Sequence, residues 1–302
     1  MADNHFRLLT PGRLDNSRQV VYEQRRRTVI QRLLHDKRAV IAALILAALT
    51  LVTLFAFLSP YDPNQLSVQN KLLAPSTAHW FGTDDHGRDY LTRVLYGGRV
   101  SLAVGLLSML IAVGLGTLIG TVSGYLGGLI DSLLMRFLDV FMSLPAFFVL
   151  MILNAYLKPS IRNMIIIIGL LSWMDTARIV RSQTMSLKQQ EFMLYARSIG
   201  LSMQRMILKH IIPGVLPSIV VAASLNVANA ILTESALSFL GLGVRPPASS
   251  WGSMLNNAQG YIGQATYLAV FPGILILIVI LSFNVLGDAL RDALETRNRQ
   301  GV

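Results

Sequence analysis

The feature that most constrains the fold of this chain is a series of long apolar runs with few or no charges. No residue between Arg99 and Asp131 is charged, and the run 39–58 is charge-free as well. A helix needs about 20 mostly apolar residues to cross a bilayer. The composition of the whole chain, 53% hydrophobic and only 14% charged residues, is also that of a membrane protein.

Six such segments follow one another along the sequence: 39–58, 100–130, 140–157, 161–180, 211–233 and 267–286. We therefore expect an all-α membrane protein with six transmembrane helices. The fourth segment is the least apolar, because it contains Arg162, Asp175 and Arg178. The predicted regions are a basic N-terminal tail (1–38), a first transmembrane helix (39–58), an extracytoplasmic loop (59–99), a core of five transmembrane helices (100–287) and a C-terminal tail (288–302).

The distribution of Lys and Arg predicts the orientation of these helices. With six helices, both termini share one side, and that side carries 19 of the 26 basic residues. Basic residues concentrate on the cytoplasmic side, so we expect both termini in the cytoplasm. Contact with anionic lipid accounts for the net charge of +10, so no nucleic-acid partner is expected. The run 39–58 follows a long leader and lacks a small-residue cleavage site, and we interpret it as a retained anchor.

A short polar stretch at about 188–210, between the fourth and fifth segments, has the pattern of a helix–turn–helix. Phe192, Tyr195, Ala196 and Ile199 recur at helical spacing on one face. Gly200 then permits a left-handed turn that ends the helix, and a second helix can begin at 202. An exposed apolar helix face at the membrane surface predicts a docking site for a partner protein.

The second apolar segment carries glycines at every fourth position: Gly116, Gly120, Gly124 and Gly128. Repeated small residues at this spacing let another helix approach closely. We expect the stripe to pack against a helix of the same subunit; a contact with a second subunit is the alternative.

Several residues inside the apolar segments are typical of a membrane pathway. Pro145 should kink the third helix, because it removes one backbone hydrogen bond. Polar side chains in membrane helices usually face the bundle interior or a wet cavity. The candidates of this kind for the pathway are Asn154, Asn226 and Asn229, and the sequence does not rank them against Glu234 and Asn284.

The sequence offers little to catalysis or metal binding. It has no cysteine and no phosphate-binding loop of the G-x-x-x-x-G-K-[ST] type, and none of its five His lies within an apolar segment. Asp84, Asp85, His86 and Asp89 form a tight cluster in the outer loop. We expect this cluster to shape a turn and to cap the following helix, with Thr83 or Asp84 as the cap, and expect no metal site.

These motifs together resemble a known family. Glu191-x-x-x-Tyr195-Ala196-Arg197-x-x-Gly200, with Ile211 and Pro213 downstream, resembles the E-A-A…G…I-x-L-P signature of ABC importer permeases. Three further stretches narrow the resemblance to the C-type permease subunit of oligopeptide and dipeptide importers: Gly82-Thr-Asp84-x-x-Gly87-Arg88-Asp89, Leu237-Ser-Phe-Leu-Gly-Leu-Gly243 with Ser250-Trp251-Gly252, and Asn284-x-x-Gly287-Asp288-x-Leu-Arg291-Asp292. The match runs over about residues 30–295.

The resemblance implies the type I ABC importer permease fold in a bacterial inner membrane. It also implies three kinds of partner: a homologous second permease, two ABC ATPase subunits that bind ATP and Mg, and an extracytoplasmic peptide-binding protein. This chain itself would then bind no cofactor and catalyse no reaction. Related subunits serve nickel chelates, glutathione or other small solutes, which leaves the substrate open. A membrane enzyme and a stand-alone ion-coupled carrier are the rival classes, disfavoured by the lack of paired catalytic groups and of an internal repeat.

The chain departs from the family pattern at three places. Tyr195 stands where the family usually has Ala, Ile211-Ile212-Pro213 replaces I-L-P, and Glu295-Thr296 replaces Asp-Pro. The first departure falls on the expected docking face and is the one that bears on partner contact.

Overall fold

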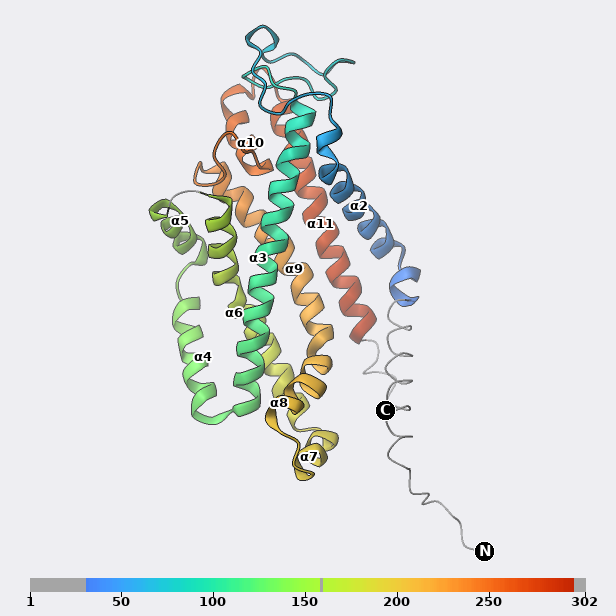
Figure 1. The fold of residues 1–302 in the computed structure, drawn as a ribbon, viewed down its shortest axis with the longest axis vertical. Helices are drawn as coiled ribbons and strands as arrows, with labels where there is room; N and C mark the ends of the chain where they lie inside the picture. The colour runs from blue at the N-terminus through green and yellow to red at the C-terminus, as the bar shows by residue number, and fades with distance from the viewer. Residues whose placement is uncertain (1–30, 158–159, 296–302) are drawn as a thin grey trace, which may run out of the picture.

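The computed structural model describes residues 31–157 and 160–295, and these form an elongated bundle of helices (Figure 1). One end carries the loop of residues 59–89, and we call it the loop end. The opposite end carries helix α7, and we call it the α7 end. The helices are α2 (Lys37–Leu54), α3 (Tyr90–Leu126), α4 (Gly128–Met142), α5 (Ala146–Tyr156), α6 (Ile161–Lys188), α7 (Glu191–Ser198), α8 (Met203–Met206), α9 (Ile212–Phe239), α10 (Trp251–Ala258) and α11 (Tyr267–Glu295).

Five of the helical segments are long and apolar enough to cross a membrane: α2, α3, α6, α8 continued by α9, and α11. A sixth crossing comes from α4 and α5, which are bent by 78° relative to each other. The direction of the chain requires this crossing. Gly169 of α6 lies beside Ile111 of α3, and Gly124 lies beside Thr184, so α3 and α6 run parallel. The intervening α4 and α5 must therefore lead the chain back towards the loop end, as Figure 1 shows.

The third predicted segment, 140–157, is wrong as a single kinked helix. Its first residues belong to α4, which begins at Gly128, and the chain breaks at residues 143–145. Pro145 occupies the N-cap of α5 with an extended backbone, so it precedes a new helix instead of kinking a continuous one. A hydropathy run records how apolar a segment is but not where it changes direction.

The other segments differ from prediction mainly at their ends. The run 39–58 ends as a helix at Leu54 and continues as a short 3-10 turn, Ala56–Leu58. The fourth segment, the least apolar, forms a continuous helix that extends to Lys188. The regions predicted as outer loop and C-terminal tail each contain helix, because α3 begins at Tyr90 and α11 continues to Glu295. Most of the predicted N-terminal tail lies outside the described residues.

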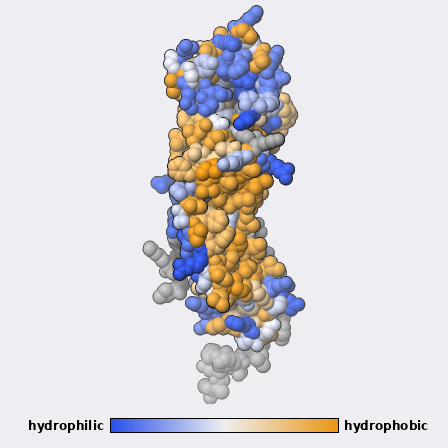
Figure 2. Space-filling view, turned by 90° about the vertical axis from the view of Figure 1, so that its left-hand side faces the viewer, coloured by the Kyte–Doolittle hydropathy of each residue, from blue (hydrophilic) through white to orange (hydrophobic). Residues whose placement is uncertain are grey.

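Two buried clusters hold the bundle together at its ends. Towards the loop end, Trp251 of α10 is fully buried against α3, and its indole Nε1 donates a hydrogen bond to the Val94 carbonyl at 2.9 Å. At the α7 end, α7, α8 and α9 share an apolar cluster around Met193, Met206 and Ile211. The molecular surface matches this plan, since an apolar band separates two hydrophilic ends (Figure 2).

The described ends of the chain lie together. The Arg32 guanidinium donates a hydrogen bond to the carbonyl of Ala293 at 3.4 Å, which joins the start of the described chain to the end of α11. This placement agrees with an even number of membrane crossings.

Candidate functional site

The segment from Glu191 to Ile211 forms the tip of the α7 end (Figure 1). Helix α7 has Glu191 in its first turn and Arg197 in its last. Both charges interact favourably with the helix dipole, the negative one at the N-terminus and the positive one at the C-terminus. Gly200 follows with φ +77, and Leu201 N–H donates to the Ala196 carbonyl at 3.2 Å across the turn. The predicted left-handed turn at Gly200 is therefore present. Ser202 holds the N-cap position of α8, but its side chain makes no capping hydrogen bond.

Helix α7 divides its apolar residues between two faces. Met193 and Ala196 are buried against Met206 and the start of α9. Phe192, Tyr195 and Ile199 point outward, and Tyr195 is 66% exposed. The predicted outward face is therefore wrong at Ala196, which belongs to the inner face. Met193 is the inner anchor that the sequence pattern missed; its spacing of three residues from Ala196 was the available signal.

The residues after α7 connect it rigidly to a membrane helix. The π-helical turn Ile207–Ile211 leads from α8 directly into α9, and Ile211 is fully buried. Pro213 is the second residue of α9, directly after the π-helical turn, where it offers no backbone N–H to the preceding turn. Helix α7 is thus connected to α6 on one side and, through α8 and the π-helical turn, to α9 on the other.

A hollow of about 340 Å³ lies between α7 and the α3–α4 turn. Its walls include Tyr125, Lys188 and Arg197, and the Lys188 ammonium lies 5.7 Å from the centre of the Tyr125 ring. The Tyr125 hydroxyl contacts the sulfur of Met206 at 3.2 Å. The tip therefore presents a basic hollow beside an exposed apolar face.

The glycine stripe packs inside this subunit. A Cβ added to Gly116 would lie 2.6 Å from Thr176 Cβ, and one added to Gly120 would lie 2.4 Å from the Ala177 carbonyl oxygen. Gly124 approaches the Arg181 carbonyl in the same way, at 2.7 Å. Gly128 does not belong to the stripe. It begins α4 with φ +58 and has open space around it, because the chain turns at Gly127.

Two ion pairs tie α4 to α6. The Arg181 guanidinium binds both carboxylate oxygens of Asp131, with an Nη2–Oδ2 distance of 2.6 Å, and Ser123 of α3 also donates to Asp131. Further along, Arg178 of α6 pairs with Asp139 of α4. Arg178, one of the charged residues that make the fourth predicted segment the least apolar, is thus paired with a residue of α4.

The four residues predicted to line the pathway lie in different environments. Asn154 is buried and donates to the Leu242 carbonyl, and Asn226 donates to the Thr176 hydroxyl at 3.0 Å. Asn229 is exposed, and Pro145 begins α5. The first two use their amides for contacts inside this subunit, Asn154 with the loop after α9 and Asn226 with α6, so a role of the four residues in the pathway stays a prediction.

Glu234 is fully buried in a cage of serine hydroxyls. Ser238 donates to its Oε1 at 2.7 Å and Ser101 to its Oε2 at 3.0 Å. Ser101 also accepts the Trp251 backbone N–H at 3.2 Å. The carboxylate therefore joins α3, α9 and α10, and the sequence had given no reason to single it out from the other polar residues.

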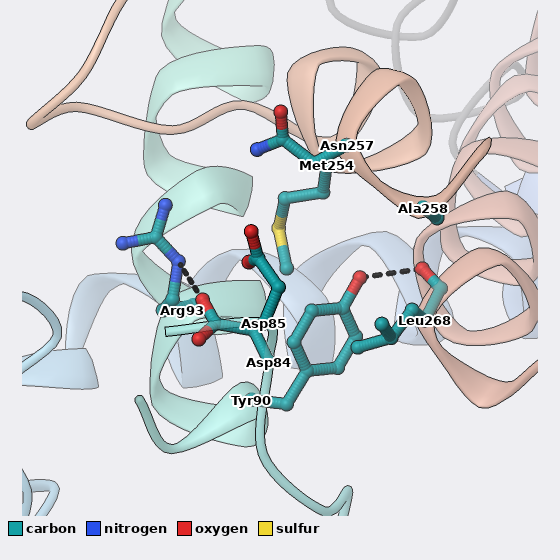
Figure 3. A pocket seen from close by; sticks show the side chains of 8 residues that line it. All are labelled: Asp84, Asp85, Tyr90, Arg93, Met254, Asn257, Ala258 and Leu268. Carbon is teal, nitrogen blue, oxygen red and sulfur yellow. Dashed lines mark hydrogen bonds and ion pairs between the residues drawn. The ribbon is translucent and has the colours of Figure 1, made fainter. Parts of the chain in front are cut away.

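The acidic cluster of the outer loop is organised by two arginines, Arg88 and Arg93, and Figure 3 shows Arg93 beside Asp84. Asp84 accepts from Arg88 Nε at 2.6 Å and lies 3.4 Å from Arg93 Nε. Asp84, Asp85 and His86 bring their ligand atoms within 4.8 Å of one another, but the two guanidiniums already neutralise Asp84. The neighbouring cavity measures only about 10 Å³.

The cluster shapes a turn as predicted, because Asp84 accepts from the backbone N–H groups of His86 and Arg88 at 2.9 and 3.0 Å. The helix that follows is capped by Asp89, not by Thr83 or Asp84. Asp89 accepts from the backbone N–H of Thr92 at 2.8 Å. The loop is also fastened to α11, because the Tyr267 hydroxyl donates to the carbonyls of Leu73 and Thr83 at 2.9 and 2.8 Å. The loop end is thus a fixed surface.

Comparisons with known proteins match this architecture. The family model of the binding-protein-dependent transport system inner membrane component matches residues 116–300. A second model, the N-terminal TM domain of oligopeptide transport permease C, matches residues 25–75.

Individual relatives agree with the family models. The chain is 38% identical over 272 residues to the dipeptide transport system permease protein DppC of Alkalihalophilus pseudofirmus, covering 90% of each chain. It is 42% identical over 261 residues to the glutathione transport system permease protein GsiD of Escherichia coli O157:H7, covering 86% of each.

One solved structure shares the fold. The inward-facing MetNI methionine ABC transporter aligns with a TM-score of 0.56 at 17% identity, over 67% of this chain and 97% of that chain. Together with the family match over most of the core, these similarities identify the chain as a member of the inner membrane component family of binding-protein-dependent transport systems.

Proposed function

We propose that this chain is a permease subunit of an ATP-driven importer that moves short peptides across the bacterial cytoplasmic membrane. The α7 end faces the cytoplasm, in line with the excess of basic residues on that side. The loop end faces outward and receives a peptide-binding protein. A homologous second permease and two ABC ATPase subunits complete the transporter, and ATP and Mg bind to the ATPases.

The observation that carries this proposal is the exposed apolar face of α7. Phe192, Tyr195 and Ile199 lie outward beyond the apolar band, on a helix fixed to α6 and α9. Large apolar side chains in such a position stabilise a protein–protein contact. An ATPase groove that accepts α7 would pass its motion to the membrane helices through these connections.

The substrate class comes from the relatives. DppC is a dipeptide permease protein and GsiD a glutathione permease protein. The compounds in the two names, dipeptides and glutathione, are small peptides or peptide-like compounds with charged ends. Glutathione is therefore the second candidate, favoured by the higher identity to GsiD.

Substitutions at the two ends of α7 test the coupling role. Glu191→Lys places a positive charge at the helix N-terminus, and Gly200→Asp strains the left-handed turn. We expect either variant to abolish peptide uptake while the protein still inserts into the membrane. Normal uptake together with normal co-purification of the ATPase would overturn the coupling role.

A further inference from the structure

Three charged side chains lie at exposed positions on two neighbouring helices: Asp139 in the last turn of α4, and Asp175 and Arg178 near the middle of α6. Arg178 of α6 pairs with Asp139 of α4, and their side chains are 45% and 52% exposed. Asp175, one turn before Arg178 on α6, is exposed and forms no ion pair with any other residue in the part of the chain that the structure describes. Ser182 and Gln183 continue this exposed polar surface towards the α7 end. We call these five residues the α4–α6 face.

Contacts with α3 give the depth of the face in the membrane. Thr176, next to Asp175, lies against Gly116. Gly116 is in the middle of the charge-free run of α3, and at about 1.5 Å per residue it lies roughly 15 Å from the end of that helix at Leu126. The hydrocarbon layer is about 30 Å thick, so Asp175 lies near its centre.

Lipid cannot be the neighbour of this face. A carboxylate or guanidinium at the centre of the bilayer is costly, and such groups face a bundle interior or a water-filled cavity. The short Asp175 side chain cannot reach a membrane surface about 15 Å away. Hydrophilic surface breaks into the lower part of the apolar band along one edge, on the side of the molecule where α4 and α5 lie (Figure 2).

Only some of the charged groups of the face pair with one another. The Arg178 guanidinium is neutralised by Asp139. Asp175 is the carboxylate of the face that has no ion-pair partner among the described residues, and in a narrow aqueous passage such a carboxylate attracts a cationic group. The other ion pair between these helices differs, since Asp131 and Arg181 are mostly buried and also bonded to Ser123.

We propose that the α4–α6 face lines the aqueous pathway between this subunit and the second permease, and that Asp175 contacts the ammonium group of the passing solute. The second part rests on the proposed function, in which the solute is a peptide with a free N-terminus. Asn154 and Asn226, bonded within the subunit, are replaced by this face as the pathway lining.

Cysteine labelling tests the exposure to water, because the chain contains no cysteine of its own. Ile179→Cys and Ser182→Cys introduce thiols on the face, and Leu118→Cys is the matched control. Leu118 is 62% exposed on α3 between Gly116 and Gly120, at the depth of residues 176–180, but on the side of the helix opposite the glycine stripe. A thiol must ionise in water to react.

We expect a membrane-impermeant methanethiosulfonate reagent to modify Ile179→Cys and Ser182→Cys at least tenfold faster than Leu118→Cys in the assembled transporter. The reagent is applied from each side of the membrane, with and without ATP. Labelling of both variants as slow as that of Leu118→Cys in every state would overturn the proposal and would place the face in a dry contact with the second permease.

Neutralising the carboxylate tests the contact with the ammonium group. Asp175→Asn should lower the rate of dipeptide uptake at least tenfold, whereas Asp175→Glu should retain most of it. The amount of chain in the membrane and its co-purification with the ATPases should stay unchanged. Uptake by Asp175→Asn at the wild-type rate would overturn the role of Asp175.

The two assays separate this inference from the proposed function. If the solute is not a peptide, the wild-type transporter takes up no dipeptide, yet Ile179→Cys and Ser182→Cys are still labelled. If the face does not line the pathway, dipeptide uptake by the wild type is normal and the two cysteines stay unlabelled.

Discussion

At the scale of single residues, small side chains decide how closely the helices approach. Gly116, Gly120 and Gly124 leave no room for a methyl group between α3 and α6. The sequence pattern predicted close packing, but it could not show that Gly128 falls beyond the end of the helix. Two consecutive glycines with positive φ, Gly127 and Gly128, turn the chain there.

Replacing Gly120 tests this packing. Its Cβ would lie 2.4 Å from the backbone oxygen of Ala177, so Gly120→Ala forces α3 and α6 apart. We expect the substitution to destabilise the protein by about 1–3 kcal/mol, seen as a lower melting temperature in detergent. Gly114→Ala, on the same helix with nothing within 4 Å, is the control and should not lower it. Equal melting temperatures for both variants would contradict the close contact.

The two faces of α7 make opposite predictions. Met193 is buried, so Met193→Ala should cost about 2–5 kcal/mol of stability. Tyr195 is exposed, so Tyr195→Ala should leave the melting temperature unchanged and weaken binding of the purified ATPase roughly 10- to 100-fold. Both effects can be measured on the same preparations. A lower melting temperature for Tyr195→Ala would show that the side chain packs within the subunit.

The limits of sequence reasoning at this scale are physical. The left-handed turn at Gly200 could be predicted, because glycine adopts this backbone conformation readily and commonly ends a helix in this way. Ala196 was placed on the wrong face, because α7 is apolar on more than one side. Which side is buried depends on Met206 and Ile211, which approach from outside the helix.

At the scale of elements, α4 and α5 are the unexpected part of the structure. Five transmembrane segments follow from apolar runs, but the charges of α4 made its start look like a loop. Those charges find partners on α6. A pairing between helices about 50 residues apart is invisible to a hydropathy window.

Removing the partners of one ion pair measures how strongly α4 is held to α6. Asp131→Leu and Arg181→Leu each leave one charge unpaired, and each should destabilise the protein by a few kcal/mol, towards the roughly 3–5 kcal/mol seen for fully buried pairs. The double variant should lose less than the sum of the two. This is a double-mutant cycle on the melting temperature. Additive losses would mean that the two side chains do not interact in the membrane.

At the scale of the whole molecule, fold class and family followed from the sequence, whereas the residues that line the pathway stay a prediction. Asn154 and Asn226 are polar in apolar segments, yet both form hydrogen bonds inside this subunit, Asn154 to the Leu242 carbonyl in the loop after α9 and Asn226 to Thr176 of α6. Asp175 and Arg178 were noted only as a weakness of the fourth segment. The depth of these two residues in the membrane and the exposure of their side chains follow only when α3 and α6 are placed side by side.

The molecule has three parts along its length: the loop end, the apolar band and the α7 end. The loop end lies on one side of the apolar band that holds the crossings, and α7 projects beyond them at the other end (Figures 1 and 2). In the proposed function, the loop end receives the binding protein. No P-loop occurs in the sequence, and in the proposed function the ATPase subunits supply the energy for transport.

The central claim is that this chain carries solute only when coupled to an ATPase, and uptake of a labelled dipeptide into proteoliposomes tests it most directly. The liposomes contain this chain with its second permease and ATPases, and the binding protein and dipeptide are presented at the loop end. We predict uptake that requires ATP on the α7 side and is lost in the Glu191→Lys complex. ATP-independent uptake by liposomes that contain this chain alone would contradict the account.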